Sequence, residues 1–222
     1  GRVRAGLCIT LLTKQEHEGL PQMPTPEIEA TSLESLCLQV RVAGFSPQAF
    51  LADMPTPPTK VRVTAAEKML LRIGAVRPAK ETENEPTALG QHLAALPCDV
   101  HIGKLLVIGA FLGVSSMAAD VAAMLSVRSP LKSTVKDPNA EAWRESLRKS
   151  LQPGGGKSDH CLYAKLLQLW HTGDRRELCK NAAVVWERMA EAASVRSQLC
   201  QALRGLGFDT KGGDDRCHGE WR

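Results

Sequence analysis

Aromatic residues are scarce in this chain of 222 residues. Only 4% of the positions are aromatic, and they comprise four Phe, four Trp and one Tyr. Proteins that bind single-stranded nucleic acid by stacking usually interleave several aromatic side chains with basic ones. The net charge of +4 permits an anionic partner without requiring one. A bound nucleic acid would therefore be held mainly through its phosphate backbone.

Long apolar runs and paired cysteine motifs are also missing. No stretch reaches the ~18 consecutive apolar residues of a membrane-spanning helix, and no secretion signal follows the opening GRVRAG. The seven cysteines are scattered and odd in number, which favours free thiols in a reducing compartment. The adjacent pairs His160-Cys161 and Cys217-His218 suit metal ligation poorly. The sequence predicts an intracellular chain, cytoplasmic or nuclear, without a membrane segment or metal site.

The glycine-rich stretch PGGGKSDH at residues 153–160 resembles a phosphate-binding loop but lacks its spacing. That loop needs Gly, four residues and then Gly-Lys-Ser/Thr, so the first Gly should stand at position 151, which is Leu. The loop must also follow a buried strand, whereas the preceding residues 146–153 are charged and typical of a helix. The stretch is therefore interpreted as a loose loop that leads into Ser158-Asp159-His160.

The first residues predict a β-strand. Residues 7–12 alternate weakly in hydropathy after Gly6, as a strand does. Because no partner strand follows, this strand would belong to a sheet formed by preceding sequence. The chain is thus expected to be a fragment of a larger protein.

Residues 25–87 predict two short helices and a polar segment. Thr31 and Glu34 have the spacing of a capping box, and Gly44 would end the first helix. A proline cluster at 54–58 precedes a second helix that ends at Gly74. The polar residues 76–87 are then a hairpin-sized segment. Two interpretations fit this pattern equally well: a winged helix, and a plain helical subdomain that carries a surface loop.

Everything from Thr87 onward predicts helices. Asp137-Pro138 is a cap followed by a proline at the first helical position, Ser158 or Asp159 caps a further helix, and Asp174 caps another. The last long helix places Arg196 within an apolar stripe. Its guanidinium would either extend to solvent at the edge of the stripe or contact a phosphate.

Several short strings occur together in the order of a known family. The sequence resembles the C-terminal region of the DEAH-box (DEAH/RHA) RNA helicases over about residues 1–208. The strings are Pro26-Glu27-Ile28, Leu89-Gly90, Leu93-Ala94, Leu96-Pro97, Asp99, Gly103-Lys104, Ala123-Met124-Leu125-Ser126, Ser158-Asp159-His160, Trp170, Cys179-Lys180-Asn181, Arg196, Gln198-Leu199 and Gly207-Phe208.

The resemblance implies a mainly α fold with four parts. Residues 1–24 would be the end of a second RecA-like α/β domain and a linker, 25–87 a winged helix, 88–208 a helical ratchet domain, and 209–222 a divergent tail. The winged helix and the ratchet would line a tunnel for single-stranded RNA and couple ATP hydrolysis upstream to translocation and unwinding. The family further implies single-stranded or structured RNA as partner, a possible protein activator, and a monomer.

The site residues implied by the resemblance are few. Arg2 would reach the γ-phosphate of ATP, where a guanidinium offsets developing charge, while ATP and Mg²⁺ would be bound by upstream domains. With no phosphate loop or acidic magnesium motif, the 222 residues alone are expected to be inactive as an ATPase. The RNA-binding residues would be Lys157, Ser158, Asp159, His160 and Arg196, although a cap, a first-turn residue and a loop charge also explain several of them.

Two other interpretations remain open. A degenerate relative would keep this scaffold as an adaptor that binds a protein partner without unwinding RNA. A separate winged-helix DNA-binding protein would need base-reading side chains on one exposed helix, and residues 31–44 offer mainly Gln39 and Arg41.

Overall fold

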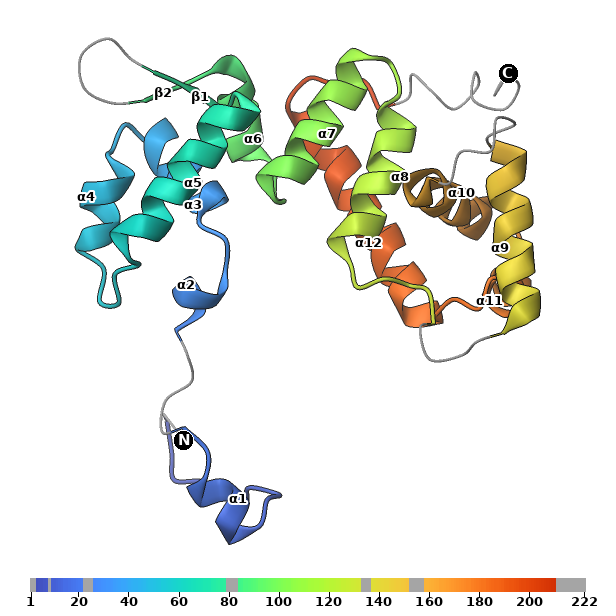
Figure 1. Cartoon of the computed structure of the whole chain (residues 1–222), viewed down its shortest axis with the longest axis horizontal. Coiled ribbons are helices and arrows are strands. Elements are labelled where there is room, and N and C mark those ends of the chain that lie inside the picture. Colours follow the sequence, from blue (N-terminus) through green and yellow to red (C-terminus); the bar gives the residue numbers. More distant parts are fainter. Residues whose placement is uncertain are drawn as a thin grey trace. The chain divides into compact units, whose positions relative to one another are not determined.

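The computed structural model describes residues 3–7, 9–21, 26–78, 84–132, 137–151 and 158–210. The chain divides into two units, Gly1–Ser32 and Leu33–Arg222. The described residues form a mainly helical fold, as predicted, with twelve α-helices and one small antiparallel sheet. Figure 1 shows the helices along the chain.

The first unit contains two short helices, α1 (Lys14–Glu18) and α2 (Glu27–Ala30). The strand predicted for residues 7–12 is wrong for the residues described, because residues 7 and 9–12 have no regular structure. A strand needs hydrogen bonds from a neighbouring strand, and the described residues provide none here. Leu7 and Leu11 are accordingly exposed.

The second unit contains ten helices and two strands in its described part. They are α3 (Glu34–Val42), α4 (Pro47–Ala52), α5 (Lys60–Ile73), β1 (Val76–Arg77), β2 (Glu85–Pro86), α6 (Ala88–Ala95), α7 (Val100–Phe111), α8 (Ser115–Ser126), α9 (Pro138–Leu151), α10 (Asp159–Thr172), α11 (Arg175–Asn181) and α12 (Trp186–Gly205).

Helices α3 and α5 end where the sequence predicted. Gly44 and Gly74 have φ of +87° and +79°, a left-handed conformation that favours glycine just after a helix. The predicted capping box of Thr31 and Glu34 is wrong. The N-cap of α3 is Leu33, and no side-chain hydrogen bond caps the helix there. The Thr31 hydroxyl donates to the carbonyl of Glu27 at 3.0 Å, at the end of α2.

A buried ion pair joins α3 to α5. The Arg41 Nη2 lies 2.5 Å from the Glu67 Oε1, and the Arg41 Nε donates to the same oxygen at 3.2 Å. The two side chains are 8% and 14% exposed. Arg41, a candidate base-reading residue of the DNA-binding interpretation, is therefore used inside the protein.

The strands β1 and β2 form the hairpin expected between residues 76 and 87. They pair antiparallel, with Val76 opposite Pro86 and Arg77 opposite Glu85. An ion pair of 3.1 Å between the exposed Arg77 and Glu85 side chains links the strands. The connection between them lies outside the described residues.

The carboxyl end of α5 is held by the helices that follow the hairpin. The Lys104 Nζ of α7 donates to the Ile73 carbonyl at 2.7 Å, and the Thr87 hydroxyl donates to the Gly74 carbonyl at 2.7 Å. A Cβ on Gly90 would lie 2.0 Å from the Ala75 carbonyl oxygen, so only glycine permits this approach of α6. We call these contacts the α5 junction.

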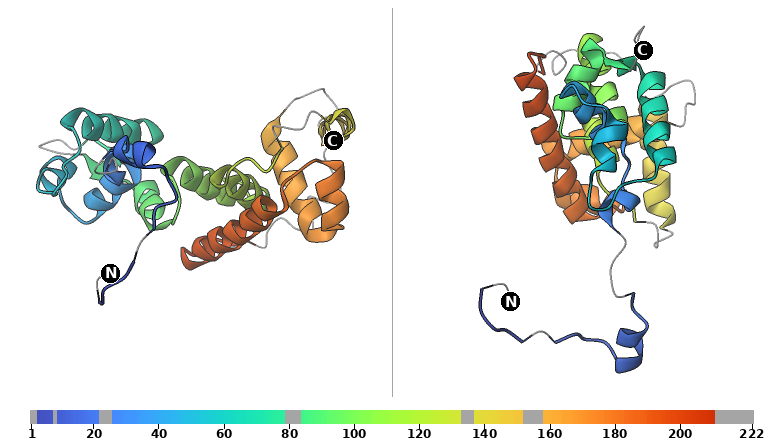
Figure 2. Two further views of the ribbon diagram at one scale, coloured as in Figure 1. Left: turned by 90° about the horizontal axis from the view of Figure 1, so that it is seen from below. Right: turned by 90° about the vertical axis from the view of Figure 1, so that its left-hand side faces the viewer.

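Helix α8 is central to the rest of the unit. It packs against α7, α10 and α12, and Figure 2 shows it beside them. A Cβ on Gly109 of α7 would lie 2.4 Å from the Ala118 Cβ, so this glycine lets α7 and α8 pack closely. The buried Trp170 of α10 packs edge-on against Trp186 of α12, with ring centroids 4.8 Å apart.

Three polar caps begin the later helices as the sequence predicted. The Asp137 carboxylate accepts from the amide of Asn139 at 2.9 Å, and the Asp174 carboxylate accepts from Arg176 at 2.7 Å. Of the two alternatives for α10, Ser158 is the N-cap.

In the described part of the chain, no single helix has the length and hydropathy to cross a membrane, and only α6 and α7 together reach them, as a pair bent by 114°.

Candidate nucleic-acid interface

The amino end of α10 presents a short polar segment. The Ser158 Oγ accepts from the Cys161 amide at 3.4 Å, which leaves other first-turn amides of the helix pointing outward. Asp159 and His160 are exposed in this first turn. A 14-residue helix carries partial positive charge at this end, which favours an anion. Lys157, predicted beside them, lies outside the described residues, as does Arg2.

The Asp159 carboxylate is partnered by α9. Its Oδ1 accepts from the Arg148 Nη2 at 2.8 Å. Partial burial acts to lower the pKa of Arg148, but the hydrogen bond and charge of Asp159, with help from Glu141, raise it above its ordinary value. The negative charge nearest the end of α10 is thus offset by an arginine that is itself only 16% exposed.

Arg196 does not lie alone at the edge of an apolar stripe. Its Nε donates to the Asp120 Oδ1 of α8, and its Nη2 donates to the Ser116 hydroxyl at 2.9 Å. The Asp120 side chain is 2% exposed, whereas that of Arg196 is 26% exposed. Because a buried carboxylate is costly without a partner, the arginine compensates a charge inside the protein.

Arg196 acts on the opposite end of α10 from His160. Burial of part of the imidazole, followed by the positive charges of Arg196 and Arg175, lowers the pKa of His171. His160 and His171 are eleven positions apart, about 17 Å along a helix axis at 1.5 Å per residue. The structure therefore brings Ser158, Asp159 and His160 together and places Arg196 toward the other end of the same helix.

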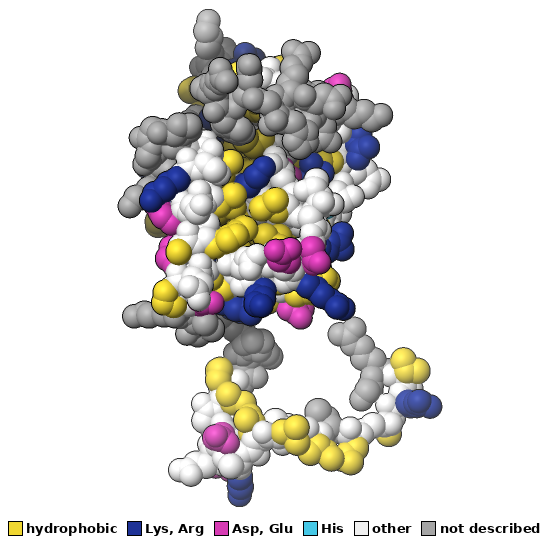
Figure 3. Space-filling model, turned by 90° about the vertical axis from the view of Figure 1, so that its right-hand side faces the viewer, with side chains coloured by type: hydrophobic (Ala, Val, Ile, Leu, Met, Phe, Trp, Pro, Cys, Tyr) yellow, Lys and Arg dark blue, Asp and Glu magenta, His cyan; other side chains and the backbone are white. Residues whose placement is uncertain are grey.

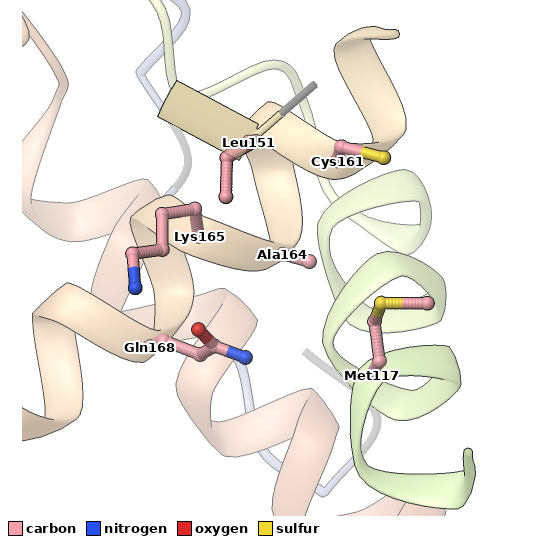
Figure 4. A pocket seen from close by; sticks show the side chains of 6 residues that line it. All are labelled: Met117, Leu151, Cys161, Ala164, Lys165 and Gln168. Carbon is pink, nitrogen blue, oxygen red and sulfur yellow. The ribbon is translucent and has the colours of Figure 1, made fainter. Parts of the chain in front are cut away.

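A small pocket lies between these ends. It is formed by α8, the last residue of α9 and the middle of α10, and Figure 4 shows its side chains. The lining residues are Met117, Leu151, Cys161, Ala164, Lys165 and Gln168. Figure 3 shows the face of the molecule on the α9 side, where hydrophobic side chains gather with both basic and acidic side chains around them. The pocket is mainly apolar, with one cation and one amide at its edge.

The chemistry available among the described residues is that of contact. No three His, Cys, Asp or Glu side chains in the described ranges gather closely enough to hold a metal ion. The serine, the exposed histidine and the first-turn amides of α10 can all donate to phosphate oxygens. This arrangement suits recognition of a nucleic-acid backbone.

Sequence reasoning missed the partners of these residues. Asp120 lies 76 positions before Arg196 and Ser116 lies 80 positions before it, so no local pattern connects them. Lys104 was noticed only as part of the Gly103-Lys104 string, and its bond to the Ile73 carbonyl gives that string a structural role. The signal available in the sequence was one charged residue in each of two apolar helices, Lys104 in α7 and Asp120 in α8.

Comparison with known proteins covers nearly the whole chain. Residues 99–163 match the model of the helicase associated domain (HA2), ratchet-like. The chain is 32% identical over 221 residues to ATP-dependent RNA helicase DHX29 of Mus musculus, covering 95% of the chain and 15% of that protein.

Two further relatives are similar over the same region. DExH-box ATP-dependent RNA helicase DExH1 of Arabidopsis thaliana is 34% identical over 220 residues, covering 95% of the chain and 21% of that protein. ATP-dependent DNA/RNA helicase DHX36 of Mus musculus is 30% identical over 216 residues, covering 94% of the chain and 21% of that protein. The chain thus spans about a fifth or less of the length of these relatives. Together these matches show that the chain belongs to the DEAH-box RNA helicase family and contains its helicase-associated, ratchet-like domain.

Proposed function

We propose that this chain is part of an ATP-dependent RNA helicase and forms one wall of the path of single-stranded RNA. Residues 25–87 would be the winged helix and 88–208 the ratchet domain, coupling ATP hydrolysis elsewhere in the protein to RNA translocation and unwinding. The observation that carries the proposal is the match of residues 99–163 to the ratchet-like domain, because these residues run from the start of α7 into the first turn of α10.

The amino end of α10 supports a contact with the RNA backbone. Its exposed His160 and first-turn amides face solvent, and Arg148 offsets the charge of Asp159. Phosphate is favoured at such a helix end by the amides and the helix dipole together. Lys157, which precedes this turn in the sequence, would add a cation there.

The α5 junction supports the coupling role. Three successive residues, Ile73, Gly74 and Ala75, are held by contacts from α6 and α7. A movement imposed on α5 therefore acts directly on the beginning of the ratchet domain. Chains of packed elements and hydrogen bonds of this kind can carry energetic coupling between distant sites.

The nucleotide chemistry would take place outside this chain. ATP and Mg²⁺ would be bound by RecA-like domains, with Arg2 reaching the γ-phosphate. We expect no ATPase activity from the 222 residues alone. ATP hydrolysis that comes from the purified chain, and not from a contaminating enzyme, would contradict this assignment.

An adaptor that binds a protein partner is the second candidate. The observation that favours it is the use of predicted RNA-binding side chains inside the protein: Ser158 caps α10, Asp159 pairs with Arg148, and Arg196 pairs with Asp120. In this case the helices would serve as a scaffold, and RNA affinity would be absent.

Fluorescence anisotropy of a labelled single-stranded RNA over a salt series tests the proposal. We expect binding that weakens steeply with salt, with a slope of about 0.7 per phosphate contacted. His160→Ala should weaken binding by about two- to tenfold, the loss of one hydrogen bond. His17→Ala, which removes an exposed histidine from α1, is the matched control and should bind as the unaltered chain does.

The two candidates differ in the outcome at low salt. RNA binding that His160→Ala weakens and His17→Ala leaves unchanged supports the tunnel wall. Absence of binding at the lowest salt, with the chain folded by circular dichroism, would reject the RNA contact and favour the adaptor.

A further inference from the structure

A groove with an apolar floor and polar edges lies away from the amino end of α10. It runs between the beginning of α7, the end of α8 and α12, and we call it the α7–α12 groove. Its main lining residues are Asp99, Ile102, Leu125, Ser126, Gln198 and Leu199. Leu199 is buried beneath it, whereas Leu125 is 40% exposed, so apolar surface remains open to a ligand.

The polar edge of the groove offers hydrogen bonds of defined direction. The Asp99 carboxylate is fixed as the N-cap of α7, where its Oδ1 accepts from the His101 amide at 2.8 Å. The Ser126 hydroxyl donates to the Ala122 carbonyl at 2.8 Å and so presents its oxygen as an acceptor. The exposed Gln198 amide has both a donor and an acceptor group.

These edge groups disfavour a phosphate. The Asp99 carboxylate repels an anion, and Ser126 faces the groove as an acceptor. The thiol of Cys98, which also lines the groove, is not a nucleophile, because burial and then the nearby Asp99 charge raise its pKa to about 11. A protonated thiol is a poor nucleophile and a poor metal ligand. The groove therefore favours an uncharged ligand that has an apolar face and hydrogen-bond donors on its edge.

The groove is a neighbour of Arg196, one of the predicted RNA-binding residues. Val195 lines the groove, and the next residue of α12 is Arg196, which reaches α8 through Asp120 and Ser116. Unpaired RNA bases are recognised through their edges once they are unstacked. A strand that passes along α12 would bring such a base to this position.

We propose that the α7–α12 groove receives one unpaired base of single-stranded RNA and prefers a base with an exocyclic amino group. The base lies over Ile102 and Leu199, its amino group donates to Asp99, and Gln198 bonds its ring edge. This inference rests on the proposed RNA-binding function and adds a base contact to the phosphate contacts at α10.

Two substitutions test the edge contacts without removing the cap of α7. Asp99→Asn keeps a good N-cap residue but can turn an amide donor toward the base. It should weaken oligo(A) and oligo(C) binding by about three- to tenfold and shift the preference toward oligo(U). Gln198→Ala should weaken binding by a similar factor. Gln201→Ala, an exposed glutamine on the same helix that does not line the groove, is the matched control.

Binding is measured by anisotropy with oligo(A), oligo(C), oligo(U) and an abasic strand of equal length over a salt series. For a base contact, Gln198→Ala lowers affinity for oligo(A) without changing the salt slope, and it leaves abasic binding unchanged. If every RNA binds and both groove variants behave like Gln201→Ala, the groove has no base contact while the tunnel wall stands. If no RNA binds the unaltered chain, both proposals are rejected.

Discussion

Two arginine–carboxylate pairs, one in each half of the second unit, show how similar chemistry produces different surfaces. In the pair of α3 and α5, Arg41 is 8% exposed and Glu67 is 14% exposed. In the pair of α8 and α12, Asp120 is 2% exposed but Arg196 is 26% exposed. In the first pair the arginine is the more deeply buried partner, and in the second it is the carboxylate. A guanidinium that compensates a buried charge while retaining exposed surface can serve both structure and ligand contact.

Removing Arg196 should have the largest effect on stability. Arg196→Met removes the cationic partner of the Asp120 carboxylate, which is only 2% exposed. Breaking a buried pair in this way costs about 4 kcal/mol. Urea unfolding followed by circular dichroism measures the loss. In the double variant Arg196→Met with Asp120→Asn the cost should fall sharply, and equal costs in single and double variants would contradict the pairing.

Glu67→Ala should cost somewhat less, about 3 kcal/mol, because the long Arg41 side chain that remains can move toward water. The same urea experiment measures it, and the pair of replacements Arg41→Met with Glu67→Leu should be close to neutral. A larger loss in Glu67→Ala than in Arg196→Met would reverse the comparison drawn between the two pairs.

Gly90→Ala should cost about 2 kcal/mol, within the range for overpacking a close contact. The new Cβ would lie 2.0 Å from the Ala75 carbonyl oxygen, so α6 has to move away from the end of α5. Gly205→Ala is the control, since nothing lies within 4 Å of its Cβ. Thermal melting should show a lower midpoint for the first variant alone.

Parts of the fold could be predicted from the sequence. Gly44 and Gly74 ended their helices as predicted, because a glycine after an apolar helical face has a local geometric reason to be there. Helix α4 was not predicted, since its six residues are too few to show a period. The pairing of Arg196 with Asp120 depends on how α8 and α12 pack, which no local pattern contains.

The candidate site was predicted only in part for the same reason. Ser158 as a helix cap follows from its position before an apolar period, and the structure confirms it. The ion pair of Asp159 with Arg148 required knowledge of where α9 lies. The RNA contacts of Lys157, Ser158, Asp159, His160 and Arg196 stay predictions.

The pKa of His171 reports the exposed charge of Arg196. In the double variant Arg196→Met with Asp120→Asn this pKa should rise, but it should stay below its ordinary value, because partial burial, the largest cause, and Arg175 remain. NMR titration of the histidine signals measures the change, with Arg204→Met of the same helix as control. RNA phosphate bound at Arg196 should raise the pKa of His171 in the same direction. If the pKa of His171 changes in neither experiment, the charge of Arg196 does not act on His171.

The smallest effect should come from Asp174, an exposed cap. Hydrogen bonds from the amides of Glu177 and Arg176 lower its pKa from the ordinary value of 3.8. Its stabilisation is therefore fully present above that value and is lost as the pH falls through the lower, folded-state pKa. Asp174→Asn keeps the cap without the charge, so its unfolding midpoint should decline less in acid. If the unfolding midpoints of both proteins depend on pH in the same way, the Asp174 charge makes no such contribution. Glu187→Gln is the control.

The α5 junction has a consequence for how the second unit comes apart. The Ala75 carbonyl accepts from the Thr87 amide at 3.0 Å, so the last turn of α5 and the first turn of α6 share their hydrogen bonds. Neither helix end can fray without breaking hydrogen bonds of the other. The amide hydrogens of Ala75 and Thr87 should therefore exchange with solvent only through the largest unfolding event of the unit, and the hairpin side and the ratchet side should melt in one cooperative transition.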